Sequence, residues 1–150
     1  MNQQLFQIID ANLNRAREGL RVCEDIARFA IADKDITKSL KSIRHATTRA
    51  LFLSKSLSLK KLLDNRDTKK DDLRFVDFKK RKGFDIADIF MSNIERVKES
   101  IRVLEECCKI IDGNVSRRYR RLRFYTYDVE KKVIEKIRYI SSNRQKCFKR

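Results

Sequence analysis

One helical pattern occurs twice in this chain, and it constrains the fold more than any other feature. The stretch ANLNRAREGLRVCEDIAR, residues 11–28, has apolar residues at helical spacing, and SNIERVKESIRVLEECCK, residues 92–109, repeats the pattern 81 positions later. The residues that recur unchanged are Asn12, Arg15, Glu18, Arg21, Val22 and Glu24, which return as Asn93, Arg96, Glu99, Arg102, Val103 and Glu105. We interpret this repeat as an internal duplication.

The segments that follow the two copies also match. KSLKSIRHAT, residues 38–47, aligns with RRYRRLRFYT, residues 117–126, at an offset of 79 positions, so the two turns before these segments should differ by two residues. The 150-residue chain has no proline and only three glycines, which favours long helices over strands and tight turns. We therefore predict an all-α fold of four long helices, arranged as two duplicated antiparallel hairpins in a bundle with approximate two-fold symmetry.

The helices are predicted over residues 2–31, 36–63, 86–111 and 116–141. Asp35 is the expected N-cap of the second helix, and Gly113 is expected to end the third in a left-handed turn. Residues 64–85 have no steady period and are predicted to connect the two halves. The prediction is a single domain over residues 1–141, with halves 1–63 and 86–141, followed by a basic tail over 142–150.

The formal net charge of +16 indicates a positive field that attracts phosphate groups, without choosing among nucleic acids, nucleotides and phosphorylated metabolites. No apolar run approaches the roughly 20 residues that a membrane helix needs, and the N-terminus lacks a signal-peptide pattern. We expect a cytoplasmic protein with no membrane contact. The four cysteines have no metal-binding spacing, which predicts reduced thiols. Phe75, Val76 and Phe78 have no assigned burial and would suit a homo-oligomer.

Asn12 and Asn93 fall within the apolar stripes of their helices, and Arg15 and Arg96 lie at the stripe borders. A buried amide without a partner costs about 1–3 kcal/mol, so both asparagines need hydrogen bonds. One interpretation is structural: the asparagines bond each other or nearby backbone, and the arginines pair with Glu18, Glu99 or another carboxylate. The other is a polar pocket at the pseudo-two-fold axis that binds an anion.

Two further groups are candidates for a site. Arg44 and His45 lie where the second helix leaves its apolar stripe, although a lone histidine is more often structural than catalytic. Arg66, Asp67 and Thr68 offer a mixture of donors and a carboxylate suited to phosphate and magnesium, or else form an ordinary helix end before a solvated charge run. Neither a P-loop nor a dinucleotide-binding glycine motif occurs, so side chains and helix N-termini would have to hold any phosphates.

These residues together resemble a known family. The stretch from Asp10 to Val22, Ile43-Arg44-His45, Arg66-Asp67-Thr68, and the second copy from Asn93 to Glu106 are similar to the helical domain found at the N-terminus of some bacterial thiamine-phosphate synthases. The resemblance extends to about residue 140. The family tends to have a glycine soon after Arg-Asp-Thr, where this chain has Asp71-Asp72-Leu73. The sequence also shows no barrel-like synthase domain, so we expect it not to make thiamine phosphate alone.

The resemblance implies a role in thiamine biosynthesis as a hydroxymethylpyrimidine-phosphate kinase, which transfers a phosphoryl group from ATP, with magnesium, onto the pyrimidine phosphate. From side-chain chemistry and position, we assign catalytic roles to Arg15, Arg96 and Asp67. Substrate binding is assigned to Asn12, Asn93, Glu18, Arg44, His45, Arg66 and Thr68, and magnesium binding to Asp67 and Glu18.

Two alternatives stay open. The chain could be a non-catalytic module that binds a pyrimidine phosphate and partners a thiamine-phosphate synthase. The basic and aromatic run from Arg120 to Tyr127 would also suit a nucleic-acid-binding protein, but no recognised reading motif is present, and the repeated asparagines and arginines would then have no role.

Overall fold

The computed structural model describes residues 3–54, 57–66 and 85–147, and within these ranges every regular element is helical. The elements are α1 (Gln3–Asp25), a π-helical turn η1 (Ile26–Ala30), α2 (Lys34–Phe52), α3 (Leu59–Asp64), α4 (Ile86–Ile111) and α5 (Gly113–Cys147). The predicted all-α class is confirmed. The described part of the chain has five α-helices, however, where four were predicted.

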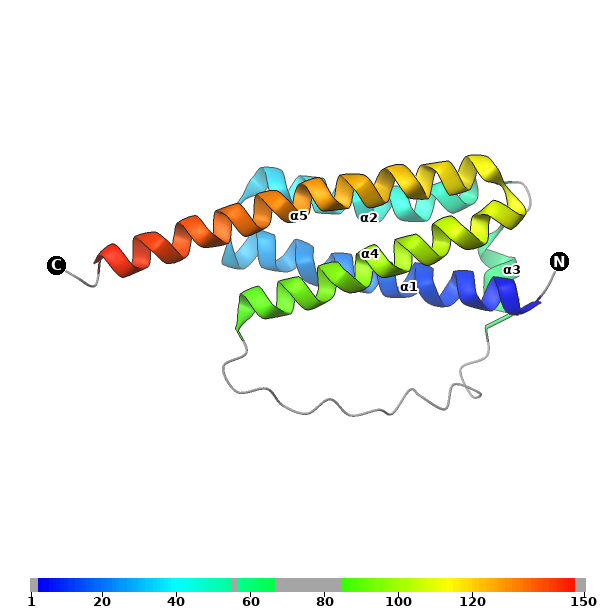
Figure 1. Ribbon diagram of the computed structural model, residues 1–150. Helices are drawn as coiled ribbons and strands as arrows, with labels where there is room; N and C mark the ends of the chain where they lie inside the picture. Colours follow the sequence, from blue (N-terminus) through cyan, green and yellow to red (C-terminus); the bar gives the residue numbers. More distant parts are fainter. Residues whose placement is uncertain (1–2, 55–56, 67–84, 148–150) are drawn as a thin grey trace.

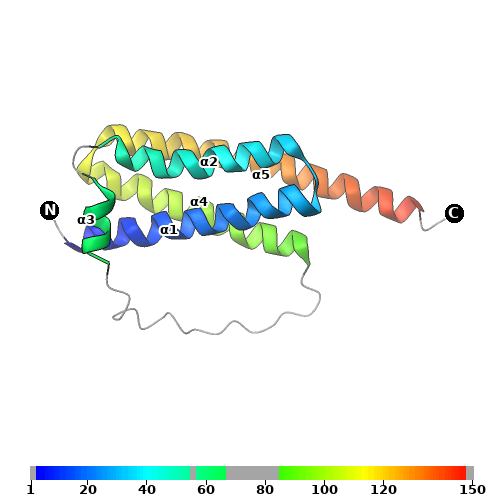
Figure 2. The same cartoon turned by 180° about the vertical axis from the view of Figure 1, so that it is seen from behind.

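The four long helices form a bundle in which neighbours run antiparallel (Figures 1 and 2). α1 packs against α2 and α4, and α5 packs against the same two helices. The short α3 lies near the start of α1, whereas α4 begins at the opposite end of the bundle (Figure 1). The C-terminal part of α5 extends beyond the other helices. None of the described helices is long and apolar enough to cross a membrane.

α1 and α4 approach each other closely at Gly19. A Cβ atom built on Gly19 would lie 2.8 Å from Cγ2 of Val97 and 3.0 Å from the backbone carbonyl oxygen of Asn93. Both distances are too short for ordinary packing, so only glycine allows the α4 backbone this close. Around this point the core is filled by buried aliphatic side chains, including Leu13, Leu20, Ile94 and Ile101.

The prediction of one continuous second helix over 36–63 is wrong. α2 ends at Phe52, and α3 begins only at Leu59. The hydroxyl of Ser58 accepts a hydrogen bond from the Lys61 amide and so caps the start of α3. The break allows α3 to pack against α1, with Leu57 and Leu62 buried in the core. Burial of these leucines favours two helices over one straight helix.

The residues expected to begin and end two helices are also different. Asp33, not Asp35, caps α2, since its Oδ1 accepts hydrogen bonds from the amides of Asp35 and Ile36 at 3.0 Å each. Asp112 does the same for α5, accepting from the amides of Asn114 and Val115. Gly113 does not form a left-handed turn; it is the first residue of α5. The extended backbone of Asp112 separates α4 from α5.

The two cap residues hold matching positions in the two hairpin turns, because Asp33 and Asp112 are 79 positions apart, as are the segments that follow them. The first turn then holds two additional residues, Ile31 and Ala32, and Ala32 has a φ of 57° in the left-handed region. α5 continues to Cys147, past residue 142 where the basic tail was predicted to begin. The internal duplication and the domain boundaries stay predictions.

We expect Gly19→Ala to destabilise the protein by about 1–3 kcal/mol, because the new methyl group would meet backbone atoms of α4 that cannot move independently. Gly113→Ala is the control, since a Cβ there meets nothing within 4 Å. It should leave stability unchanged or raise it by up to about 1 kcal/mol through helix propensity. Urea unfolding followed by circular dichroism measures both. Equal stabilities for the two variants would contradict the close approach.

Candidate anion-binding site

Asn12 and Asn93 satisfy their amides within their own helices. The Nδ2 atom of Asn12 donates to the carbonyl oxygen of Ile8 at 2.8 Å, and that of Asn93 donates to Ile89 at 2.8 Å. Asn12 is buried at 7% exposure, and Asn93 is half-buried. Of the two interpretations, hydrogen bonding to nearby backbone therefore describes both amides, and their assignment to a substrate stays a prediction.

The arginine and glutamate that follow each of these asparagines in the repeat do not reach the interior. Arg15, Glu18, Arg96 and Glu99 are all exposed, so the expected polar pocket at the pseudo-axis is not built from them. Long charged side chains at the border of an apolar stripe extend their head groups into water, which explains this outcome. Gly19 and Val97 fill the crossing of α1 and α4 instead.

Each hairpin instead holds a buried glutamate between two arginines. In the first, Glu24 Oε2 lies 2.8 Å from Arg44 Nε and its Oε1 lies 3.6 Å from Arg21. In the second, Glu105 Oε2 lies 2.9 Å from Arg123 Nε and its Oε1 lies 3.0 Å from Arg102. The two glutamate side chains are 8% and 4% exposed. We call these the Glu24 cluster and the Glu105 cluster.

The sequence contains a signal for these clusters. The repeated Arg21–Glu24 and Arg102–Glu105 pairs have the i, i+3 spacing of helical ion pairs, and Arg44 aligns with Arg123 in the following helix. Only Arg44 was selected as a site residue. The structure gives it a structural partner, so any substrate contact must use donors that Glu24 leaves unoccupied.

A pocket of about 480 Å³ adjoins the Glu105 cluster between α4 and α5. Its lining combines five cationic side chains with one carboxylate, one hydroxyl and one glycine, namely Arg102, Lys109, Arg117, Arg120, Arg123, Glu105, Ser116 and Gly113. The hydrogen bond to Glu105 raises the pKa of Arg123, and Ser116 donates to the Glu105 carbonyl oxygen at 2.8 Å. The pocket is therefore strongly positive and held by contacts between both helices.

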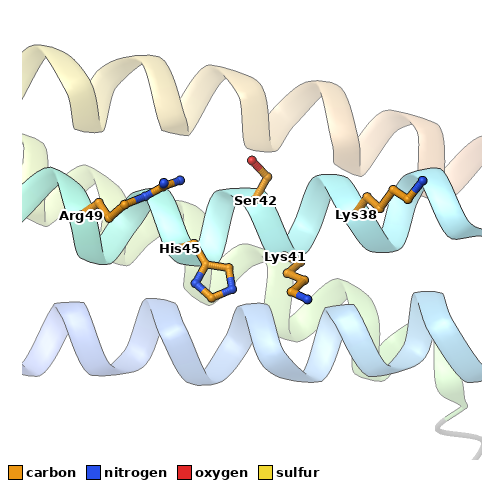
Figure 3. Close-up of a pocket in the computed structure, with 5 residues that line it drawn as sticks. All are labelled: Lys38, Lys41, Ser42, His45 and Arg49. Carbon is orange, nitrogen blue, oxygen red and sulfur yellow. The ribbon is translucent and has the colours of Figure 1, made fainter.

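A second, shallower pocket of about 350 Å³ follows the surface of α2. It is lined by Lys38, Lys41, Ser42, His45 and Arg49, all of which α2 carries (Figure 3). This places His45, one of the predicted binding residues, among three cations. Arg44 precedes it in sequence but bonds Glu24.

Arg66 forms a two-armed ion pair that sequence analysis did not anticipate. Its Nε and Nη2 atoms donate to the two carboxylate oxygens of Asp10 at 2.7 and 2.8 Å. Asp10 is buried on α1, so this pair fastens the end of α3 to α1. The same hydrogen bonding raises the pKa of Arg66. Asp67 and Thr68, predicted beside it, lie outside the described residues.

In the part of the chain that the structure describes, the side chains form neither a metal-binding site nor a reactive thiol site. No group of three or more histidine, cysteine, aspartate or glutamate side chains there could hold a metal ion. Cys23, Cys107 and Cys108 are free thiols, and burial raises the pKa of Cys23 and of Cys108 to about 12. The assignments of ATP, and of magnesium at Glu18 and Asp67, stay predictions.

A family model with the description ThiD2 family matches residues 7–132, most of the chain. The chain belongs to this family. It is 33% identical over 128 residues to a thiamine-phosphate synthase of Prochlorococcus marinus strain AS9601, covering 85% of this chain and 34% of the relative. A thiamine-phosphate synthase of Prochlorococcus marinus subsp. pastoris is 35% identical over 133 residues, covering 87% and 36%. One from Synechocystis sp. PCC 6803 is 32% identical over 127 residues, covering 84% and 35%.

This ThiD2-family chain thus spans about a third of the length of the curated relatives it matches. No solved structure matches it. The comparison supports a relation to thiamine biosynthesis enzymes. It overturns the prediction of a hydroxymethylpyrimidine-phosphate kinase, because these relatives are named for a synthase reaction and not for a kinase.

Replacing Glu105 by glutamine should destabilise the bundle, because it removes the charge that compensates Arg123, whose side chain is only 13% exposed. We expect a loss on the order of 2 kcal/mol, reduced from the fully buried case because Arg102 is exposed. Glu24→Gln should have a comparable effect. Glu106→Gln, at an exposed ion pair one position along α4, is the control and should change stability little. Urea unfolding free energies decide, and a Glu105 variant as stable as the Glu106 variant would refute the structural role of the cluster.

Proposed function

We propose that the chain acts in thiamine biosynthesis as a helical module that binds a phosphorylated small molecule of the thiamine-phosphate synthase reaction. The site is the pocket between α4 and α5. Two findings support the proposal: the relatives are named thiamine-phosphate synthase, and they contain a region similar to nearly the whole of this chain. The ligand class follows from the chemistry of the pocket.

The observation that carries the proposal is the charge balance of the pocket. Five cationic side chains line it, and its one carboxylate, Glu105, is already paired with Arg102 and Arg123. An incoming phosphate therefore meets no uncompensated negative charge. The volume of about 480 Å³ lies within the range of roughly 300–1,000 Å³ typical of small-molecule sites.

Side chains, and not a helix N-terminus, would hold the phosphate. Although α5 begins at this pocket, the backbone amides of Asn114 and Val115 in its first turn already donate to the side chain of Asp112. The Arg120 side chain has no hydrogen bond or ion pair within the described residues, so its guanidinium can present a complete donor fork. Arginine forks match the oxygen geometry of phosphate groups and bind them in two-point contacts. Arg120 is therefore the expected principal anchor.

The second part of the proposal concerns the partner. The region that matches this chain is about a third of each relative, so each relative has additional chain of about twice that length. We propose that this chain associates with a thiamine-phosphate synthase catalytic unit, so that a ligand held between α4 and α5 is close to the enzyme that makes or uses it. Co-elution of the purified chain with such a unit in size-exclusion chromatography tests this, and independent elution at micromolar concentrations argues against it.

Isothermal titration calorimetry with thiamine phosphate and with inorganic pyrophosphate tests the pocket. We expect Arg120→Gln to weaken binding at this pocket about tenfold, which corresponds to about 1.4 kcal/mol. Lys132→Gln, an equal charge change at an exposed position elsewhere on α5, should leave the affinity nearly unchanged.

Equal losses in the two variants would indicate attraction by net charge alone, and no binding of either compound would reject the function. Single-stranded DNA is the comparison polyanion. If DNA binds the protein and neither phosphate compound does, the module is a nucleic-acid binder and the proposal fails.

A further inference from the structure

We infer that the chain has a second, separate anion-binding site, the α2 groove lined by Lys38, Lys41, Ser42, His45 and Arg49, which takes a small phosphate-bearing ligand. The structure assigns to it a diphosphate group as the best-matched chemical class. This inference goes beyond the proposed function and does not require it, because the two sites share no residue.

The groove has donors and no acceptor carboxylate. Three cations, a hydroxyl and an imidazole line it, and none of these five side chains has a hydrogen bond or ion pair within the described part of the chain. Other cations of this protein that lie beside a carboxylate are paired with it, as Arg44 is with Glu24 and Lys98 is with Glu130. The donors of the groove are thus directed at solvent, where an anion can meet them.

Two cations of the α2 groove match two cations of the α4–α5 pocket in the sequence repeat. Lys38 and Lys41 lie 79 residues before Arg117 and Arg120, which line the α4–α5 pocket. Each pair of cations lies on a helix that also carries an arginine bound to a buried glutamate, Arg44 on α2 with Glu24 and Arg123 on α5 with Glu105. In both hairpins the charge of this glutamate is therefore compensated before any ligand arrives.

The dimensions of the groove select the ligand. Residues 38, 41, 42 and 45 repeat at helical neighbour spacing and span seven residues, or about 10 Å along the axis. Figure 3 shows Lys41 and His45 extending toward α1 and Ser42 toward α5, with Lys38 and Arg49 at the two ends of the row. A single phosphate could contact only part of this row. Two linked phosphates can engage Lys41 and His45, which extend to the same side, together with one flanking cation.

Calorimetric titration of the full chain with inorganic pyrophosphate tests the inference through its stoichiometry. We expect two sites per chain in the wild type. Lys41→Gln should weaken one of them at least fivefold and leave the other intact, whereas Arg120→Gln should weaken the other one. The Lys132→Gln variant is the charge-matched control and should retain both sites. Circular dichroism verifies that each variant keeps its helical content.

The outcomes separate the two proposals. One site that is lost in the Arg120 variant and unaffected in the Lys41 variant overturns the second site and leaves the proposed function intact. One site lost only in the Lys41 variant does the reverse. Equal weakening in all three variants, or binding of single-stranded DNA without binding of pyrophosphate, overturns the α2 site as a small-ligand site.

Discussion

The charge of a carboxylate buried between two helices has to be compensated by a nearby positive charge, and this requirement shapes the structure at both ends of the bundle. Glu24 and Glu105 each take one arginine from their own helix and one from the next helix along the chain. Removing either partner would leave a charge with poor access to water, which is costly. The two clusters thus join α1 to α2 and α4 to α5 in a fixed register. The pocket between α4 and α5 is lined by all three residues of the second cluster, Arg102, Glu105 and Arg123.

Sequence patterns predicted the four long helices because hydrophobic spacing depends only on local geometry. The same patterns misplaced the polar residues. An asparagine in an apolar stripe can bond the carbonyl oxygen four residues earlier, as Asn12 and Asn93 do, and the stripe alone does not distinguish this from a ligand contact. Arg15 and Arg96 extend outward because their side chains are long enough to reach water. A helical wheel gives the direction in which a side chain leaves the backbone, but not how far the side chain extends.

Other misses depended on contacts distant in sequence. Asp10 and Arg66 are 56 residues apart, and neither position reveals the other. The break between α2 and α3 was hidden in the leucine-rich run of residues 51–63, which has helical character throughout. Burial of Leu57 and Leu62 against the rest of the core decides the break, and this is a tertiary effect. Membership in the ThiD2 family agrees with the resemblance seen in the sequence, while the relatives that match the chain are named thiamine-phosphate synthase.

The antiparallel packing of α1 against α4 has a consequence for communication within the molecule. It sends the two hairpin turns to opposite ends of the bundle (Figure 1). Any influence of one turn on the other would have to travel along the shared helices. The tight passage at Gly19 is where such a signal would cross from one half to the other, since there the two backbones have almost no room to slide independently.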